Sequence, residues 1–109
     1  ASAGAKTIIL DVDNKRANTF LNGLAKISPV FYELFDCTKL KELEKNFSNV
    51  ISKHGNPNIF VNCSYPRTKD WGGAVGSSFE DISFDSFREN VDIHMNSYAW
   101  LARLAAENI

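Results

Sequence analysis

Residues 6–12 read Lys6-Thr7-Ile8-Ile9-Leu10-Asp11-Val12, a continuous apolar and β-branched run. Such runs are typical of strands that are buried on both faces of a parallel sheet. Residues 30–35 form a second run, which ends at Asp36-Cys37-Thr38, and residues 58–62 form a shorter third run. The sequence therefore predicts three strands.

Helical periodicity separates these runs. The first predicted helix starts at a cap on Asn14 and ends before Ser28-Pro29, because the residue before a proline is pushed into an extended conformation. The second starts at a cap on Thr38 and ends at Gly55, a natural left-handed terminator. A long third helix starts at about Ser83. Strands that alternate with helices pair in parallel, so we expect an open α/β sheet with helices on its faces.

Composition and charge exclude several classes of function. The chain has 109 residues, of which 44% are hydrophobic and 23% charged, as in ordinary globular proteins. A net charge of -1 and scattered basic residues argue against a nucleic-acid partner. No apolar run approaches the ~18 residues of a membrane span, and residues 1–6 lack the core of a signal peptide. We expect a cytoplasmic chain without a membrane partner, with Cys37 and Cys63 reduced and buried.

Each predicted strand ends in a polar residue, namely Asp11, Asp36 or Asn62. Ligands of open α/β sheets bind at the carboxyl ends of the strands. A carboxylate at such an end suits the neighbouring hydroxyls of an adenosine ribose, because its oxygens carry several lone pairs. The alternative is that Asp11 or Asp13 serves only a turn or the start of a helix.

Four successive landmarks resemble the short-chain dehydrogenase/reductase family. They are Asp11 at the end of its strand, Asp36-Cys37-Thr38, Val61-Asn62-Cys63-Ser64, and Phe87-Arg88-Glu89-Asn90-Val91-Asp92-Ile93-His94. Their order and spacing agree over nearly the whole chain, and residues 62–67 and 89–98 are most similar to oxidoreductases of flagellin and surface-sugar modification. The resemblance implies a partial Rossmann-like domain over residues 1–109. In the intact enzyme it implies hydride transfer between NAD(P) and a carbonyl or alcohol substrate.

The resemblance also implies roles for individual residues. Asp11 would hold the adenosine ribose, and Asp36 and Cys37 would border the adenine. Asn62, Cys63 and Ser64 would begin the loop beside the nicotinamide. Where the family has Asn-Asn-Ala-Gly, this chain has Asn62-Cys63-Ser64-Tyr65. The side chain of Tyr65 puts close approach of the backbone to the cofactor in doubt.

His94 occupies the position of the family's catalytic asparagine. An imidazole there could organise a water molecule, or it could be a partly buried histidine that is satisfied by a neighbour. As to the cofactor, a carboxylate at Asp11 would repel the 2′-phosphate of NADP, which favours NAD. Lys15 and Arg16 follow closely and could weaken this preference.

The resemblance locates other parts of the family's site outside residues 1–109. The glycine-rich phosphate loop would precede Ala1, and the catalytic tyrosine and lysine would follow Ile109. We therefore expect a fragment that is inactive alone, rather than a small protein that is completed by self-association. The glycine cluster of residues 72–76 follows a loop instead of a strand, so it is predicted to be a substrate-side loop and not a phosphate site.

Two further patterns carry little weight. Tyr65 and Lys69 have the spacing of the family's proton-donor pair, but Pro66 would spoil the helix that this pair needs. The histidines and carboxylates form no recognisable metal site or Ser/His/Asp arrangement.

Two other interpretations compete with the oxidoreductase fragment. One is a non-catalytic module that self-associates and binds at most the adenosine part of a nucleotide. In the family the long helix packs against its counterpart in a partner subunit, so candidates for a homo-oligomer interface are Phe84, Phe87, Val91, Tyr98 and Trp100. The other is an unrelated flavodoxin-like domain.

Overall fold

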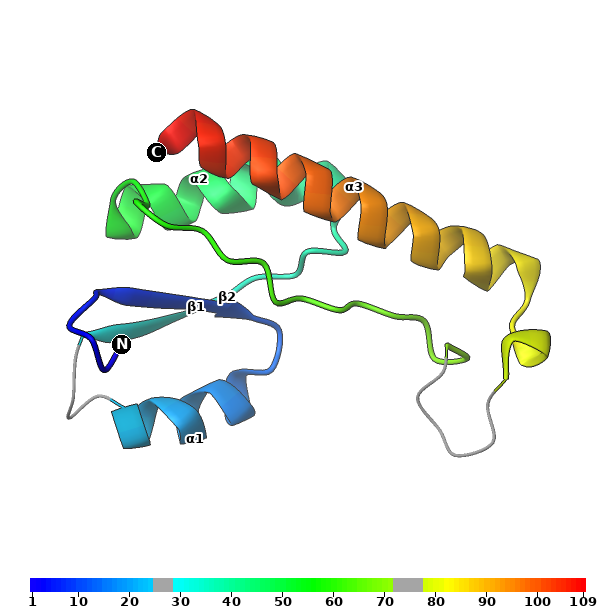
Figure 1. Ribbon diagram of the computed structural model, residues 1–109, viewed down its shortest axis with the longest axis horizontal. Helices are drawn as coiled ribbons and strands as arrows, with labels where there is room; N and C mark the ends of the chain where they lie inside the picture. The colour runs from blue at the N-terminus through cyan, green and yellow to red at the C-terminus, as the bar shows by residue number, and fades with distance from the viewer. Residues whose placement is uncertain (25–28, 72–77) are drawn as a thin grey trace.

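The computed structural model describes residues 1–24, 29–71 and 78–109. The order of its elements is β1 (Thr7–Asp11), α1 (Asn14–Leu24), β2 (Val30–Leu34), η1 (Leu40–Glu42), α2 (Leu43–His54), η2 (Phe79–Asp81) and α3 (Phe84–Asn108). Helix α1 lies on one side of the two strands, and α2 and α3 lie on the other side (Figure 1). Among the described elements, no helix is long and apolar enough to cross a membrane.

The two strands pair in parallel, as their sequence pattern predicts. The register runs from Thr7 opposite Val30 to Asp11 opposite Leu34. The backbone N–H of Phe35 donates to the carbonyl of Asp11 at 3.0 Å, which continues the pairing one residue further. Both strands therefore end at the same edge of the sheet.

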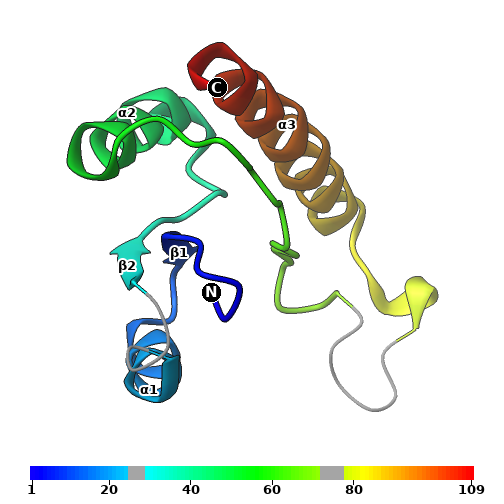
Figure 2. The ribbon, with the colours of Figure 1, turned by 60° about the vertical axis from the view of Figure 1, so that its left-hand side comes forward.

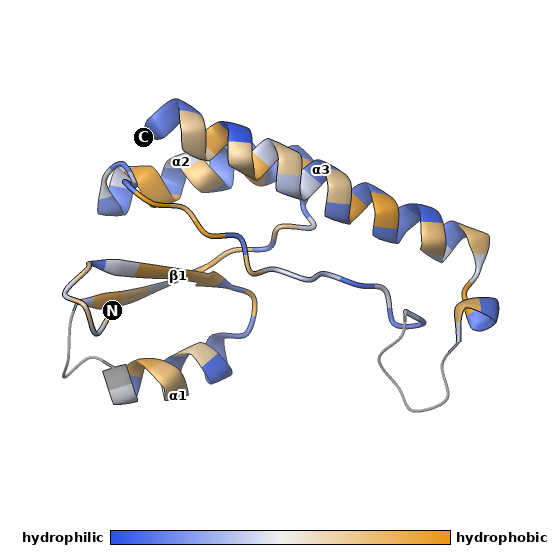
Figure 3. Ribbon diagram, viewed as in Figure 1, coloured by the Kyte–Doolittle hydropathy of each residue, from blue (hydrophilic) through white to orange (hydrophobic). Residues whose placement is uncertain are grey.

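The core lies between the sheet and the α2–α3 pair. Hydrophobic side chains follow β1 and α2 and return along the C-terminal half of α3 (Figure 3). The buried members of this cluster are Phe35, Leu43, Phe47, Leu101, Leu104 and Ala105. Leu43 is 1% exposed and Phe47 is 3% exposed, so α2 is held mainly by its first two turns.

The predicted ends of two helices are confirmed. Gly55 ends α2 with φ +88°, and its N–H donates to the carbonyl of Ile51 at 2.8 Å. Ser83 caps α3, where its hydroxyl accepts from the N–H of Ser86 at 3.1 Å.

The predicted caps at Asn14 and Thr38 are wrong. The carboxylate of Asp13 accepts from the N–H of Arg16 at 2.9 Å, so Asp13 caps α1 and Asn14 is the first residue of the helix. The hydroxyl of Thr38 donates to Asp36 instead of accepting from a helix N–H. Helix α2 therefore starts at Leu43, after the short 3₁₀ turn.

The expected third strand does not form. In the described ranges the sheet has two strands, and no backbone hydrogen bond reaches residues 58–62. Ile59 is 80% exposed and Val61 is 72% exposed. A strand exists only where a neighbour lies within about 4.8 Å to receive its hydrogen bonds. The segment runs from the end of α2 past β1 toward α3 without such a neighbour (Figure 2).

Candidate functional site

Polar residues gather where the two strands end. Asp11 closes β1, and Asp36 and Cys37 follow the end of β2 at the same edge. Burial raises the pKa of the Cys37 thiol, the hydroxyl of Ser64 lowers it, and the nearby carboxylates of Asp36 and Asp11 raise it further. Asp11, Asp36 and Cys37 therefore share one edge of the sheet, and Ser64 is near enough to this edge to affect the thiol.

The carboxylate of Asp11 stabilises its own turn. Its Oδ1 atom accepts from the N–H groups of Val12 at 2.7 Å and of Asp13 at 3.2 Å. This is the turn role that the sequence left open as an alternative. Only one of the two carboxylate oxygens is used in this way, and the side chain is exposed. Among the described residues no hydrogen bond reaches the Oδ2 atom, so its lone pairs are available to a ligand.

The turns at Asp36 and Asn62 have the same geometry. Asp36 Oδ1 accepts from the N–H of Thr38 at 2.9 Å and from its hydroxyl at 2.6 Å. Asn62 Oδ1 accepts from the N–H of Ser64 at 3.0 Å and from its hydroxyl at 2.6 Å. Such turns fix the local backbone, after β2 at Asp36 and in the segment outside the sheet at Asn62. The spacing Asp/Asn-x-Ser/Thr is visible in the sequence and could have predicted both turns.

Tyr32 belongs to this region, although its sequence position does not suggest it. Its hydroxyl donates to the carbonyl of Asp11 at 2.8 Å. Burial, followed by the negative charges of Asp11 and Asp13, raises the pKa of this phenol. Tyr32 therefore stays neutral and holds the end of β1 in place.

His94 lies on α3, in contact with the extended chain that follows Ser64. Its Nε2 atom is hydrogen-bonded to the carbonyl of Pro66. Its ring is 4.9 Å from the ring of Tyr65 and 5.8 Å from the ring of Tyr98, with which it stacks at 11°. This is the geometry of a histidine satisfied by its neighbours, because the nitrogen that faces the chain is already used.

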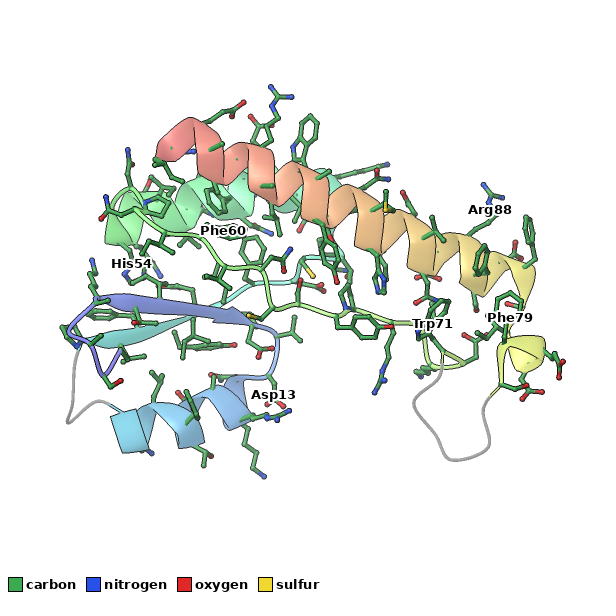
Figure 4. The ribbon with its side chains drawn as sticks, viewed as in Figure 1. Asp13, His54, Phe60, Trp71, Phe79 and Arg88 are labelled. Carbon is green, nitrogen blue, oxygen red and sulfur yellow. The ribbon has the colours of Figure 1, made fainter. Side chains whose placement is uncertain are left out.

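Tyr65 lies in extended chain and Lys69 lies in the turn after it, so the two share no helical face. The side chain of Tyr65 is 61% exposed, and its hydroxyl accepts from the indole N–H of Trp71 at 3.2 Å. Trp71 is labelled in Figure 4, close to the N-terminal half of α3. Tyr65 and Lys69 therefore have the spacing of the family's proton-donor pair without the helix that such a pair needs, as the sequence predicts. The glycine cluster of residues 72–76 lies outside the described residues.

The two cysteines differ from the expectation of buried thiols. Both are free, but Cys63 is exposed and only Cys37 is partly covered. Cys63 follows Asn62 in a segment without strand neighbours, so nothing covers its side chain. Within residues 1–24, 29–71 and 78–109 no group of His, Cys, Asp and Glu could hold a metal ion.

Comparisons with known proteins add no relative to this description. The chain matches no family model, no curated protein and no solved structure.

Proposed function

We propose that this chain forms the adenosine-binding side of a dinucleotide site, in an oxidoreductase of the short-chain dehydrogenase/reductase type. The observation that supports this proposal is the meeting of Asp11, Asp36, Cys37 and Ser64 at the carboxyl ends of parallel strands. In open α/β sheets this edge is where nucleotides bind. Hydride transfer to a carbonyl, or from an alcohol, is proposed for the enzyme as a whole and not for residues 1–109 alone.

Each group has a distinct part in the proposed recognition. The outer oxygen of Asp11 accepts hydrogen bonds from the ribose hydroxyls, while its Oδ1 atom keeps the turn fixed. Asp36 and the half-buried Cys37 form the wall against the adenine. The turn from Asn62 through Cys63 to Ser64 begins the nicotinamide side.

NAD is the preferred cofactor in this proposal. A phosphate on the ribose 2′-oxygen would lie beside the carboxylates of Asp11 and Asp13, and like charges at that distance repel. Lys15 and Arg16 are exposed on the first turn of α1, where solvent and salt screen them. They reduce the preference for NAD without reversing it.

The proposal also concerns the sheet. We infer that residues 58–62 are a strand of a larger, Rossmann-like parallel sheet. They have the apolar pattern of a strand, and in Figure 2 they run past the side of β1 that lies away from β2. An additional strand between β1 and this segment would satisfy both backbones and cover Ile59 and Val61.

Calorimetric titration with NAD, NADP and ADP-ribose tests the binding proposal. NAD and ADP-ribose should bind, and Asp11→Asn should weaken both by about tenfold or more, because hydrogen bonds to a charged group are lost. Asp13→Asn is the matched control, since it removes a neighbouring charge and keeps a good helix cap. Equal affinities of the wild type and Asp11→Asn would refute the ribose role of Asp11.

A second candidate function is self-association through α3. The outer face of this helix carries an apolar stripe of Phe84, Phe87, Val91 and Met95. Tyr98, another interface candidate from the sequence, is half-buried with its hydroxyl on the carbonyl of Ser64 and is not part of the stripe. Phe84 is 73% exposed, Met95 is 66% exposed and Val91 is 45% exposed, and the stripe borders an open groove. An apolar face of this kind marks an interaction surface.

The spacing of the stripe favours a second copy of the same chain. Phe87 and Met95 each lie four residues from Val91, so the centre of the stripe is symmetric about Val91. In an antiparallel pair Val91 meets Val91, and Phe87 meets Met95. Arg88 of each copy then lies near Asp92 of the other, as a two-fold interface requires. Trp100 lies nine residues from Val91, which on an α-helix is the opposite side, so it is not part of this stripe.

A further inference from the structure

An extended segment after Ser64 is tied to α3 by three side chains at regular intervals. We call residues 64–71 the strap, in which residues 64–68 are extended and residues 69–71 form a turn. The hydroxyl of Tyr98 donates to the carbonyl of Ser64 at 2.6 Å, and His94 is hydrogen-bonded to the carbonyl of Pro66. Asn90 accepts from the N–H of Thr68 at 3.0 Å. The strap therefore runs antiparallel to α3, as Figure 1 shows.

The three contacts form together because the spacing of side chains along α3 matches the spacing of residues along the strap. Four residues of an α-helix rise about 6 Å, and two residues of extended chain advance about 6.6 Å. Asn90, His94 and Tyr98 are four residues apart on one helical face, and their partners are two residues apart on the strap. Burial along the strap alternates accordingly. The half-buried positions are Ser64, Pro66, Thr68 and Asp70, and the exposed ones are Tyr65, Arg67 and Lys69.

Asn90 carries the most connected of the three contacts. It is 1% exposed, and its amide nitrogen donates at 2.7 Å both to the hydroxyl of Thr68 and to the carbonyl of Ser86. Thr68 donates in turn to Asp70 at 2.7 Å. A buried amide with partners for both of its ends fixes one position of the strap, because any sliding would leave a buried polar group unpaired.

The other end of the strap belongs to the candidate site. Ser64 completes the turn at Asn62 and lies beside Cys37, and Tyr98 also borders this thiol. The strap thus connects the buried amide of Asn90 with the carboxyl edge of the sheet. It does so without a ladder hydrogen bond to either strand in the described part of the chain.

We propose that Asn90, His94 and Tyr98 are positioning residues, which hold the strap so that Ser64 stays beside Cys37, just after the end of β2. The inference rests on the proposed function only for the identity of the ligand that binds at the strand ends. The position of the strap itself can be measured without a nucleotide, through the accessibility of the thiol.

The experiment follows the reaction of Cys37 with a thiol reagent such as 5,5′-dithiobis(2-nitrobenzoate). The chain has two cysteines, so Cys63→Ser leaves Cys37 as the sole thiol. In that background Tyr98→Phe removes one oxygen and should speed the reaction about fivefold, the factor expected from one lost hydrogen bond. Tyr65→Phe is the control. This variant also removes a hydroxyl from the strap region, but the hydroxyl of Tyr65 makes its hydrogen bond to Trp71 and not to α3. The rate of the Cys37 reaction should therefore not change.

A second pair of variants separates positioning from general stability. Thr68→Val removes the hydroxyl that Asn90 and Asp70 bind and should speed the reaction, whereas Thr68→Ser keeps the hydroxyl and should restore the slow rate. Circular dichroism would establish that each variant is folded. Equal rates for Tyr98→Phe and Tyr65→Phe, or a Cys37 that reacts in Cys63→Ser as fast as in the denatured chain, would overturn the inference. If the rates shift as expected but NAD does not bind, only the proposed function fails.

Discussion

Glu33 connects β2 to the C-terminal end of α2. Its Oε1 atom lies 2.9 Å from Nε2 of His54, and its Oε2 atom lies 3.2 Å from Nζ of Lys53. The ammonium of Lys6 donates a hydrogen bond to the carbonyl of His54 at 2.8 Å. The same ammonium lies 5.5 Å from the centre of the Phe31 ring. The hydrogen bond from His54, followed by that from Lys53, holds the pKa of Glu33 below its ordinary value of 4.5.

This lowered pKa predicts how stability depends on pH. A carboxylate with a lowered pKa in the folded state contributes stability above its unfolded pKa and loses that contribution as the pH falls through the folded value. Glu33→Gln should therefore lose less stability than the wild type when the pH is lowered below 4.5. Urea unfolding between about pH 7 and pH 3 measures the effect. Glu89→Gln, on the exposed side of α3, should leave the acid dependence unchanged; the same dependence in Glu33→Gln and wild type would contradict the prediction.

Single residues also show where sequence reasoning fails. Asp13 and Asn14 are both good caps, and the sequence does not decide between neighbours that differ by one position. Thr38 is drawn away from its expected cap by Asp36, two residues earlier. Tyr32 and Asn90 could not be identified as site residues, because their partners lie 21 and 22 residues away in the chain.

At the scale of the elements, substitution of Gly55 tests the described end of α2. Gly55 ends α2 with φ +88° and ψ 177°, a conformation that is almost confined to glycine and costs a residue with a Cβ atom about 1–3 kcal/mol. No atom lies within 4 Å of where that Cβ would be, so the cost is conformational and not steric. Gly55→Ala should lower the free energy of unfolding by about this amount.

Gly23 is the matched control within the chain. It lies in α1, and a Cβ atom would meet nothing within 4 Å there either. Because alanine favours a helix over glycine, Gly23→Ala should raise the free energy of unfolding by roughly 0.5–1 kcal/mol. Denaturant unfolding of both variants checks the opposite signs, and a stabilising Gly55→Ala would be inconsistent with the described helix end.

The elements that the sequence predicts well are those with local causes. The apolar runs of β1 and β2, the stripe of α2 and the start of α3 at about Ser83 are read within a few residues, and all of them are confirmed. The run at residues 58–62 has an equally clear strand pattern, but a strand also needs a partner, and a partner is not encoded in the run itself. The strap has no strong pattern of its own and takes its extended form from the face of α3.

At the scale of the whole molecule, the stripe on α3 predicts a concentration-dependent dimer. Val91→Glu places two like charges opposite each other at the proposed two-fold axis and should abolish the dimer in analytical ultracentrifugation. Trp100→Glu introduces the same charge on the opposite side of the helix and should leave the dimer intact. A wild type that stays monomeric at all concentrations, or a dimer that survives Val91→Glu, would refute the interface.

The candidate site was predicted in part. Asp11, Asp36 and Cys37 meet because parallel strands with adjacent ends bring their carboxyl edges together, which the alternation of strands and helices already implies. The sequence could not show that each polar end also closes its own turn, or that α3 holds the segment of Ser64 in place. Those features depend on contacts between residues that are distant in the sequence.

The most direct test of the central claim is an NMR titration of the ¹⁵N-labelled chain with ADP-ribose. The amide signals of residues 11–13, 36–38 and 62–64 should shift together, with one saturation curve, and the signals of α1 beyond its first turn should stay in place. Shifts confined to one of these three turns, or no shifts at millimolar ligand, would contradict the claim that the strand ends form one nucleotide site.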